Sequence, residues 1–255
     1  MKIRHTLTAG RPALVAYLTC GDPDLETTLE LARLLATEGC DIIELGIPFS
    51  DPVAEGPVIE AAQLRALESG TSTEAVFDLV RRLRDGDAGQ PPVTVPVVVT
   101  TYANTVFAHG IEAWARDASA VGVQGLILPD VPLEERDEFA IPLATSGIEL
   151  IPLLGSTTPD RLSRIAAAAA DTSFVQLVAP ASEIAAQIAL IRDAAPGLPV
   201  AAGCETLSAA EVLAAGADAI VTAGSLMELV AAHGRAAADA LRGHIRGLLA
   251  QITAA

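Results

Sequence analysis

Lysine is almost absent from the sequence. The one lysine, Lys2, lies in the terminal segment, so a buried lysine that could form a Schiff base with a carbonyl substrate is not available. Histidine is also scarce, and the four copies show neither HxH nor HxxxH spacing, which argues against a catalytic zinc held by histidines. If the protein is an enzyme, its acid–base chemistry falls to carboxylates and tyrosines.

Basic residues and long apolar runs are scarce as well. The chain has 16 Lys and Arg against 32 Asp and Glu, so binding to nucleic acid or to an anionic membrane, which needs clustered Lys and Arg, is not expected. No stretch reaches the roughly 18 apolar residues of a membrane span, and the N-terminus lacks the features of a secretory signal. The three cysteines have no CxxC spacing and are interpreted as reduced core thiols. We therefore expect a soluble cytoplasmic protein.

Short apolar runs alternate with amphipathic segments along the whole chain. Helix signals accompany the amphipathic segments, such as the N-cap candidates Thr71 or Ser72 and Ser208. Such alternation predicts parallel strands joined by helical crossovers, and eight units in about 250 residues predict a single (β/α)₈ TIM barrel domain over residues 1–255. The alternative is an open doubly wound sheet, but the first strand is not followed by GxGxxG. The eight predicted strands span residues 12–18, 40–46, 95–100, 123–129, 148–154, 173–179, 198–203 and 217–223.

One carboxylate, Glu44, interrupts the second apolar run, CDIIELG. Side chains alternate along a strand, and both faces of a barrel strand are buried, so a lone acid fits best at the inner mouth of the barrel. Burial without a cation raises the pKa of a carboxyl group toward neutrality, as a proton donor or acceptor requires. A structural acid held by an ion pair or by hydrogen bonds is the alternative.

A second acid, Glu55, follows eleven residues later in the loop SDPVAEGP, which prolines stiffen. Taken alone, it would be interpreted as a solvated loop residue. A loop of this length can also fold back over the barrel mouth and place the two acids on opposite sides of one substrate, in different protonation roles.

Four segments carry a resemblance to a known family: TCGDP, ELGIPFSDPVAEGP, TYANTVFAHGIEAW and GLILPDVPLEE. Together they resemble the α subunit of tryptophan synthase, over essentially the whole chain. The resemblance implies a (β/α)₈ barrel that cleaves indole-3-glycerol phosphate by a retro-aldol reaction without metal or Schiff base. It further implies that Glu44 is the general acid/base at the substrate's C3 and hydroxyl, and that Glu55 is a second catalytic carboxylate at the indole N–H. The partner it implies is a pyridoxal-phosphate β subunit.

Further residues are expected at the mouth of the barrel. Asp22, Asp51 and Asp130 are expected to hold loops through Asx-type hydrogen bonds rather than to perform chemistry. For the ring-lining candidates, plain packing of the top layer is the alternative to substrate contact. The substrate-binding candidates are Tyr17, Phe49, Tyr102, Leu128, Leu153 and Gln176, the last where the family has tyrosine.

The sequence departs from the family pattern at both ends of the site. Glu55 replaces an aspartate, and the loop after the sixth strand is reduced to APASEIAAQ. At the positions of the family's phosphate loops, this chain has Gly203 and Glu205 after the seventh strand and Ala223-Gly224 after the eighth. Because a carboxylate at Glu205 would repel a phosphate dianion, a substrate without phosphate is a hypothesis.

Three functions therefore stay open. The first is the family's lyase reaction. The second is a diverged enzyme that carries out aldol or proton-transfer chemistry on a different or non-phosphorylated substrate. The third is a non-catalytic barrel that binds a β-like subunit.

Overall fold

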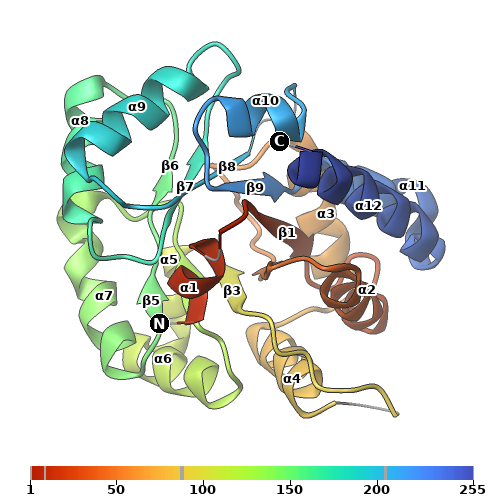
Figure 1. The fold of residues 1–255 in the computed structure, drawn as a ribbon. Coiled ribbons are helices and arrows are strands. Elements are labelled where there is room, and N and C mark those ends of the chain that lie inside the picture. Colours follow the sequence, from red (N-terminus) through yellow and green to blue (C-terminus); the bar gives the residue numbers. More distant parts are fainter. Residues whose placement is uncertain (1, 9, 87–88, 204–205, 255) are drawn as a thin grey trace.

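The computed structural model describes residues 2–8, 10–86, 89–203 and 206–254, with parallel strands at the centre and helices around them (Figure 1). The strands are β1 (Ala13–Thr19), β2 (Ile42–Gly46), β3 (Val97–Thr100), β4 (Gly125–Ile127), β5 (Glu149–Leu150), β6 (Leu153–Leu154), β7 (Val175–Val178), β8 (Val200–Gly203) and β9 (Ala219–Thr222).

The α-helices pack mainly outside the strands. They are α1 (Lys2–Leu7), α2 (Leu25–Glu38), α3 (Pro57–Glu68), α4 (Thr73–Asp85), α5 (Ala103–His109), α6 (Ile111–Ala120), α7 (Arg136–Thr145), α8 (Pro159–Ala168), α9 (Ile184–Ala194), α10 (Ala209–Ala214), α11 (Gly224–His233) and α12 (Ala238–Ala254). Two short 3₁₀ helices, η1 (Leu133–Glu135) and η2 (Gly234–Ala236), precede α7 and α12.

The strands form a closed (β/α)₈ barrel, as predicted, and not an open doubly wound sheet. All described pairings are parallel, in the order β5-β4-β3-β2-β1-β9-β8-β7-β6. The predicted fifth strand is divided at Ile151-Pro152, so that β5 pairs with β4 and β6 pairs with β7. One segment of chain therefore joins both ends of the sheet order, and its proline lacks the N–H that an unbroken strand would use.

Apolar side chains fill both sides of the barrel wall. The inner cluster contains Val15, Ile42, Val98 and Ile127, while Leu14, Leu18 and Leu45 belong to the larger cluster between the strands and the helices. Strands buried on both faces read as continuous apolar runs, which is why they could be recognised in the sequence. From α1, Ile3 and Leu7 join the inner cluster and close the end of the barrel opposite the strand C-termini.

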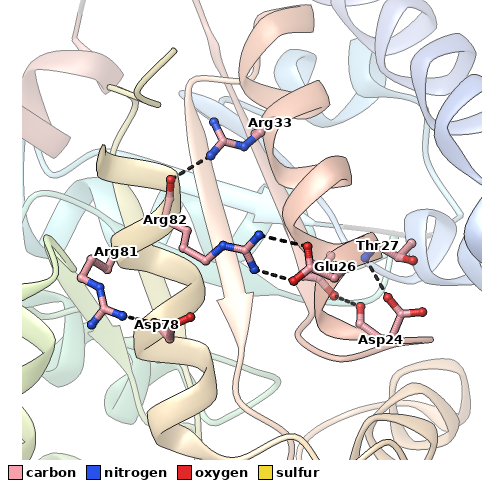
Figure 2. A network of polar contacts seen from close by, with 8 residues as sticks. Asp24, Glu26, Thr27, Arg33, Asp78, Arg81 and Arg82 are labelled. Carbon is pink, nitrogen blue, oxygen red and sulfur yellow. Dashed lines mark hydrogen bonds and ion pairs between the residues drawn. The ribbon is translucent and has the colours of Figure 1, made fainter. Parts of the chain in front are cut away.

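Charged side chains link helices on the outer surface. Figure 2 shows Arg82 of α4 reaching Glu26 of α2, with a contact of 3.0 Å to Glu26 Oε2, while Arg33 of α2 donates to the Arg82 carbonyl at 2.8 Å. Exposed pairs of this kind contribute about 1 kcal/mol or less, so burial of the apolar helix faces dominates the packing of α2 and α4. In the described part of the chain, no helix is long and apolar enough to cross a membrane.

Candidate active site

Glu44 lies on β2 and points into the barrel. It pairs in register with Tyr17 of β1 and Val98 of β3, and the Val98 side chain belongs to the inner cluster. Its side chain is buried, with 3% of the residue exposed. The Thr100 hydroxyl donates a hydrogen bond to Glu44 Oε1, whereas Oε2 has no hydrogen-bond partner among the described residues. One oxygen is therefore fixed, and the other is left for a ligand.

The surroundings of Glu44 favour its protonated form. Burial raises the pKa of the Glu44 carboxyl group, and the nearby negative charge of Glu55 raises it further. The side chains of Thr100 and Gln176 act in the opposite direction, because they stabilise the carboxylate. Within the described residues, Glu44 forms no ion pair with an arginine. A carboxyl group in this setting is suited to proton transfer at a higher pH than an ordinary glutamate.

Glu55 is held over the mouth by Tyr102. The Tyr102 hydroxyl donates to Glu55 Oε2 and accepts from the backbone N–H groups of Val53 at 2.9 Å and Ala54 at 3.1 Å. The Phe49 ring stacks on the Tyr102 ring, with centroids 4.9 Å apart. Burial and the Glu55 carboxylate both raise the pKa of Tyr102, so the phenol stays protonated and donates. Tyr102 therefore organises the loop that carries Glu55.

Tyr17 lies beside Glu44 across the β1–β2 pairing. Its hydroxyl oxygen accepts a hydrogen bond from Thr19 at 3.2 Å and lies over Gly46, where an added Cβ would come within 2.2 Å of it. Burial raises the pKa of Tyr17, and the charge of Glu44 adds to the effect. Gly46 is thus needed for close approach of the tyrosine at the mouth.

Gln176 completes the wall from β7. It pairs in register with Leu153 of β6 and Ala201 of β8, and the Ala201 side chain lies in the inner cluster. The Gln176 side chain is buried and lowers the pKa of the Glu44 carboxyl group. Its Oε1 has no hydrogen-bond partner among the described residues. Two unpartnered oxygens, one on each side chain, are therefore present at this level of the barrel.

Leu153 and Leu128 are placed differently from one another. Leu153 packs against the inner cluster. Leu128 belongs instead to the cluster on the helix side, because alternation along β4 turns its neighbour Ile127 inward. Both leucines line a cavity of about 380 Å³ whose lining does not include Glu44 or Glu55.

Sequence reasoning missed Thr100, the hydrogen-bond donor to Glu44. The available signal was the position of Thr100, which ends β3 opposite Gly46, two residues after the inward-facing Val98.

The sequence also did not reveal how Asp22 is held. Instead of an Asx-type contact, the buried Asp22 carboxylate forms an ion pair with the partly exposed Arg65 of α3, with N–O distances of 2.8 and 2.7 Å. This pair fixes the loop after β1 to the helix that follows the Glu55 loop.

The proposed phosphate end is described only in part. Gly203 ends β8, and Glu205 lies outside the described residues. Ala223 precedes α11 and Gly224 is its first residue, so backbone N–H groups of a helix N-terminus follow β9 at the barrel mouth. The loop after β7 is tied to the loop after β6, because Glu183 accepts hydrogen bonds from Ser156 at 3.1 Å and from Gln187 at 2.8 Å.

Known proteins match this chain over nearly its full length. The family described as "Tryptophan synthase alpha chain" matches residues 3–246. The tryptophan synthase alpha chain of Phenylobacterium zucineum is 43% identical over 235 residues, which cover 87% of this chain and 82% of that one. The alpha subunit structure from Legionella pneumophila str. Paris superposes with a TM-score of 0.87 at 30% identity, covering 100% of this chain and 99% of that one.

A second similar structure comes from an assembly. It is a chain of the tryptophan synthase α2β2 complex of Pyrococcus furiosus, with a TM-score of 0.82 and 30% identity, covering 94% of this chain and 99% of that chain. Sequence and structure agree over nearly the full length. The chain therefore belongs to the tryptophan synthase alpha chain family, whose members are lyases of tryptophan synthesis.

Proposed function

We propose that Glu44 and Glu55 are the two catalytic carboxylates of a cofactor-free retro-aldol cleavage that converts indole-3-glycerol phosphate into indole and glyceraldehyde 3-phosphate. The main support for the proposal is the environment of the Glu44 carboxyl group. It is buried at the barrel mouth, its pKa is raised by burial, and its Oε2 has no partner among the described residues.

Glu44 acts first as an acid and then as a base. It donates its proton to C3 of the indole ring, so that the ring can accept the electron pair of the breaking C–C bond. The resulting carboxylate takes the proton of the adjacent substrate hydroxyl as the aldehyde forms, which returns Glu44 to its starting state. Thr100 keeps the carboxyl group oriented through Oε1 during both transfers.

Glu55 acts at the other edge of the ring. Positive charge develops at the indole nitrogen when C3 is protonated, and a carboxylate near the N–H stabilises it. The Tyr102 hydroxyl and the stacked Phe49 ring support the position of Glu55. The longer side chain therefore takes the role of the family's aspartate, with the loop held in place by Tyr102.

Gln176 and α11 bind the rest of the substrate in this proposal. The free Oε1 of Gln176 accepts a hydrogen bond from a hydroxyl group of the glycerol chain, next to Glu44. The phosphate lies near the N-terminus of α11, at Ala223-Gly224, and near Gly203, because N-terminal N–H groups and the helix dipole favour an anion. Tyr17 and Leu153 contact the ring from β1 and β6.

A β-type subunit is the proposed protein partner. The similarity to a chain of the Pyrococcus furiosus α2β2 complex supports it. In this family the partner carries pyridoxal phosphate and receives the indole. Because the loop after β7 is short and is tied to the loop after β6, we expect communication with such a partner to depend less on it than on the Glu55 loop.

Steady-state release of indole by the isolated chain tests the proposal. The Glu44→Gln variant keeps the shape of the side chain but cannot exchange a proton, so we expect turnover to fall by a factor of about 10³, with an unchanged far-ultraviolet spectrum. Equal turnover by the two proteins would reject the role of Glu44, and no turnover by the native chain would favour the non-catalytic alternative.

The same assay with the dephosphorylated substrate tests the phosphate end. Because α11 offers N–H donors, we expect kcat/KM to favour the phosphorylated substrate by at least about tenfold. Equal use of both substrates would support a diverged enzyme that does not select for phosphate.

A further inference from the structure

A cavity outside the pair of glutamates has the properties of a second ligand site. It has a volume of about 380 Å³ and lies between the segment after β4, the break between β5 and β6, and α8. That volume is within the range of pockets that bind small molecules. Neither Glu44 nor Glu55 lines it.

Most of the residues that line the cavity are apolar. Val131, Leu153, Ile165 and Ala169 line it, together with three prolines and several further aliphatic side chains. Ile165 and Ala169 belong to the α8 side, and Leu153 to the barrel wall. Such walls fit the body of a small aromatic or aliphatic molecule.

Three charged side chains line the cavity, and two of them are already engaged by opposite charge or by helix N–H groups. Arg161 pairs with both oxygens of Glu134, at 2.9 and 3.0 Å. Asp130 accepts from the Ala103 N–H at the start of α5, at 3.0 and 3.2 Å. Neither charge therefore needs a ligand for its compensation.

Arg136 differs from these two residues. Its guanidinium donates to the carbonyls of Leu150 at 3.2 Å and Ala168 at 3.4 Å, and no carboxylate of the described residues forms an ion pair with it. Its Nε–H is buried and has no hydrogen-bond partner in the described part of the chain. An unpaired buried donor on a charged group is costly, and an anionic acceptor would remove that cost.

We propose that this cavity binds a small apolar carboxylate, with the carboxylate on Arg136 and the apolar body between β6 and α8. Leu153 is shared with the residues proposed to contact the substrate ring, but the proposal uses neither catalytic glutamate and does not depend on the retro-aldol reaction. Arg136 also borders a broader hollow of about 740 Å³ beside Arg4, so the experiment must separate the two places.

Calorimetric titration of the full chain with 3-phenylpropionate, and with the neutral 3-phenylpropionamide, tests the proposal. We expect the acid to bind at least about tenfold more tightly than the amide, because the amide cannot form a charge-assisted hydrogen bond. The Arg136→Gln variant should lose this preference.

Three further variants make the test specific. Arg4→Gln is the matched control, because Arg4 also donates to two backbone carbonyls, at 3.0 and 3.1 Å, but lines only the broader hollow; it should bind the acid like the native chain. Ala169→Leu keeps Arg136 and fills the cavity, so it should weaken binding of both compounds. The Glu44→Gln variant should bind as the native chain does.

Several results would overturn the proposal. They are absence of binding up to roughly 10 mM acid, native affinity in Arg136→Gln or in Ala169→Leu, and loss of binding in Arg4→Gln or Glu44→Gln. Failure of the retro-aldol assay would leave all of these measurements unchanged, so the two proposals fail independently.

Discussion

At the scale of single residues, the site depends on the different hydrogen bonding of the two carboxyl oxygens of Glu44. Thr100 holds Oε1, while Oε2 meets no partner among the described residues. A carboxyl group satisfied on both sides would be a structural acid, and one exposed to water would keep its ordinary pKa. Burial with one free oxygen makes the group available to a substrate at the cost of folding stability.

Because of this cost, we expect the free energy of unfolding of the native chain and of the Glu44→Gln variant to differ by an amount that depends on pH. The raised pKa means that the folded chain binds a proton at Glu44 more tightly than the unfolded chain does. This contribution to stability is therefore present at low pH and is lost as pH rises through the folded-state pKa. We expect Glu44→Gln to be more stable than the native chain at neutral pH, by about 1.4 kcal/mol for each tenfold difference in proton affinity between the folded and unfolded chains, and the difference to shrink on acidification.

Urea unfolding of both proteins at a series of pH values measures this difference. The Glu38→Gln variant serves as a control of opposite sign, because ion pairs with Arg246 and Arg242 lower the pKa of the Glu38 carboxyl group. If the free energies of unfolding of the native chain and the Glu44→Gln variant differed by the same amount at every pH, the raised pKa of Glu44 would be contradicted.

Tyr102 provides a second prediction at this scale. Tyr102→Phe removes the hydroxyl that bonds Glu55 and two backbone N–H groups, but keeps the ring stacked on Phe49. Because small misplacements of a catalytic group are costly, we expect kcat to fall by a factor of about 10 to 100 with little change in melting temperature. Thr253→Val, which removes an exposed hydroxyl bond on α12, is the control. Native kcat in Tyr102→Phe would show that the loop does not need this contact.

At the scale of elements, boundaries with a chemical signal were predicted and the others were not. Ser72 and Ser208 cap α4 and α10 as predicted, and Ser208 forms a capping box with Glu211. In α7 the sequence signal for a helix is weak, because Pro142 lies inside it and proline is disfavoured in a helix interior. The division into β5 and β6 was missed because an apolar run does not show where strand pairing changes sides.

Strand β2 gives a prediction at this scale. A methyl group at Gly46 would clash with the Tyr17 hydroxyl, at 2.2 Å, so Gly46→Ala must push the tyrosine out of the mouth. We expect a loss of about 1–3 kcal/mol in the free energy of unfolding, together with loss of activity. Gly247→Ala on α12, which meets nothing within 4 Å, should stabilise the chain by about 0.5–1 kcal/mol. Urea unfolding compares the two variants, and equal effects would contradict the close approach.

At the scale of the whole molecule, the barrel follows from the alternation of strands and helices, and it places every strand C-terminus at one mouth. Glu44 could be proposed from the sequence because an acid within an apolar strand is rare. The inward or outward direction of Leu128, the contact between Thr100 and Glu44, and the pairing of Asp22 with Arg65 could not, since each depends on register between strands or on residues distant in sequence. We propose that residues 1–255 act as one domain around this mouth.

The central claim is that a carboxyl group buried at this mouth exchanges a proton in the pH range of catalysis. A carbon NMR titration of the native chain with labelled glutamate, with the Glu44 signal assigned from its loss in Glu44→Gln, measures this most directly. The account predicts a midpoint clearly above the ordinary glutamate value of about 4.3. A midpoint at or below that value would contradict it.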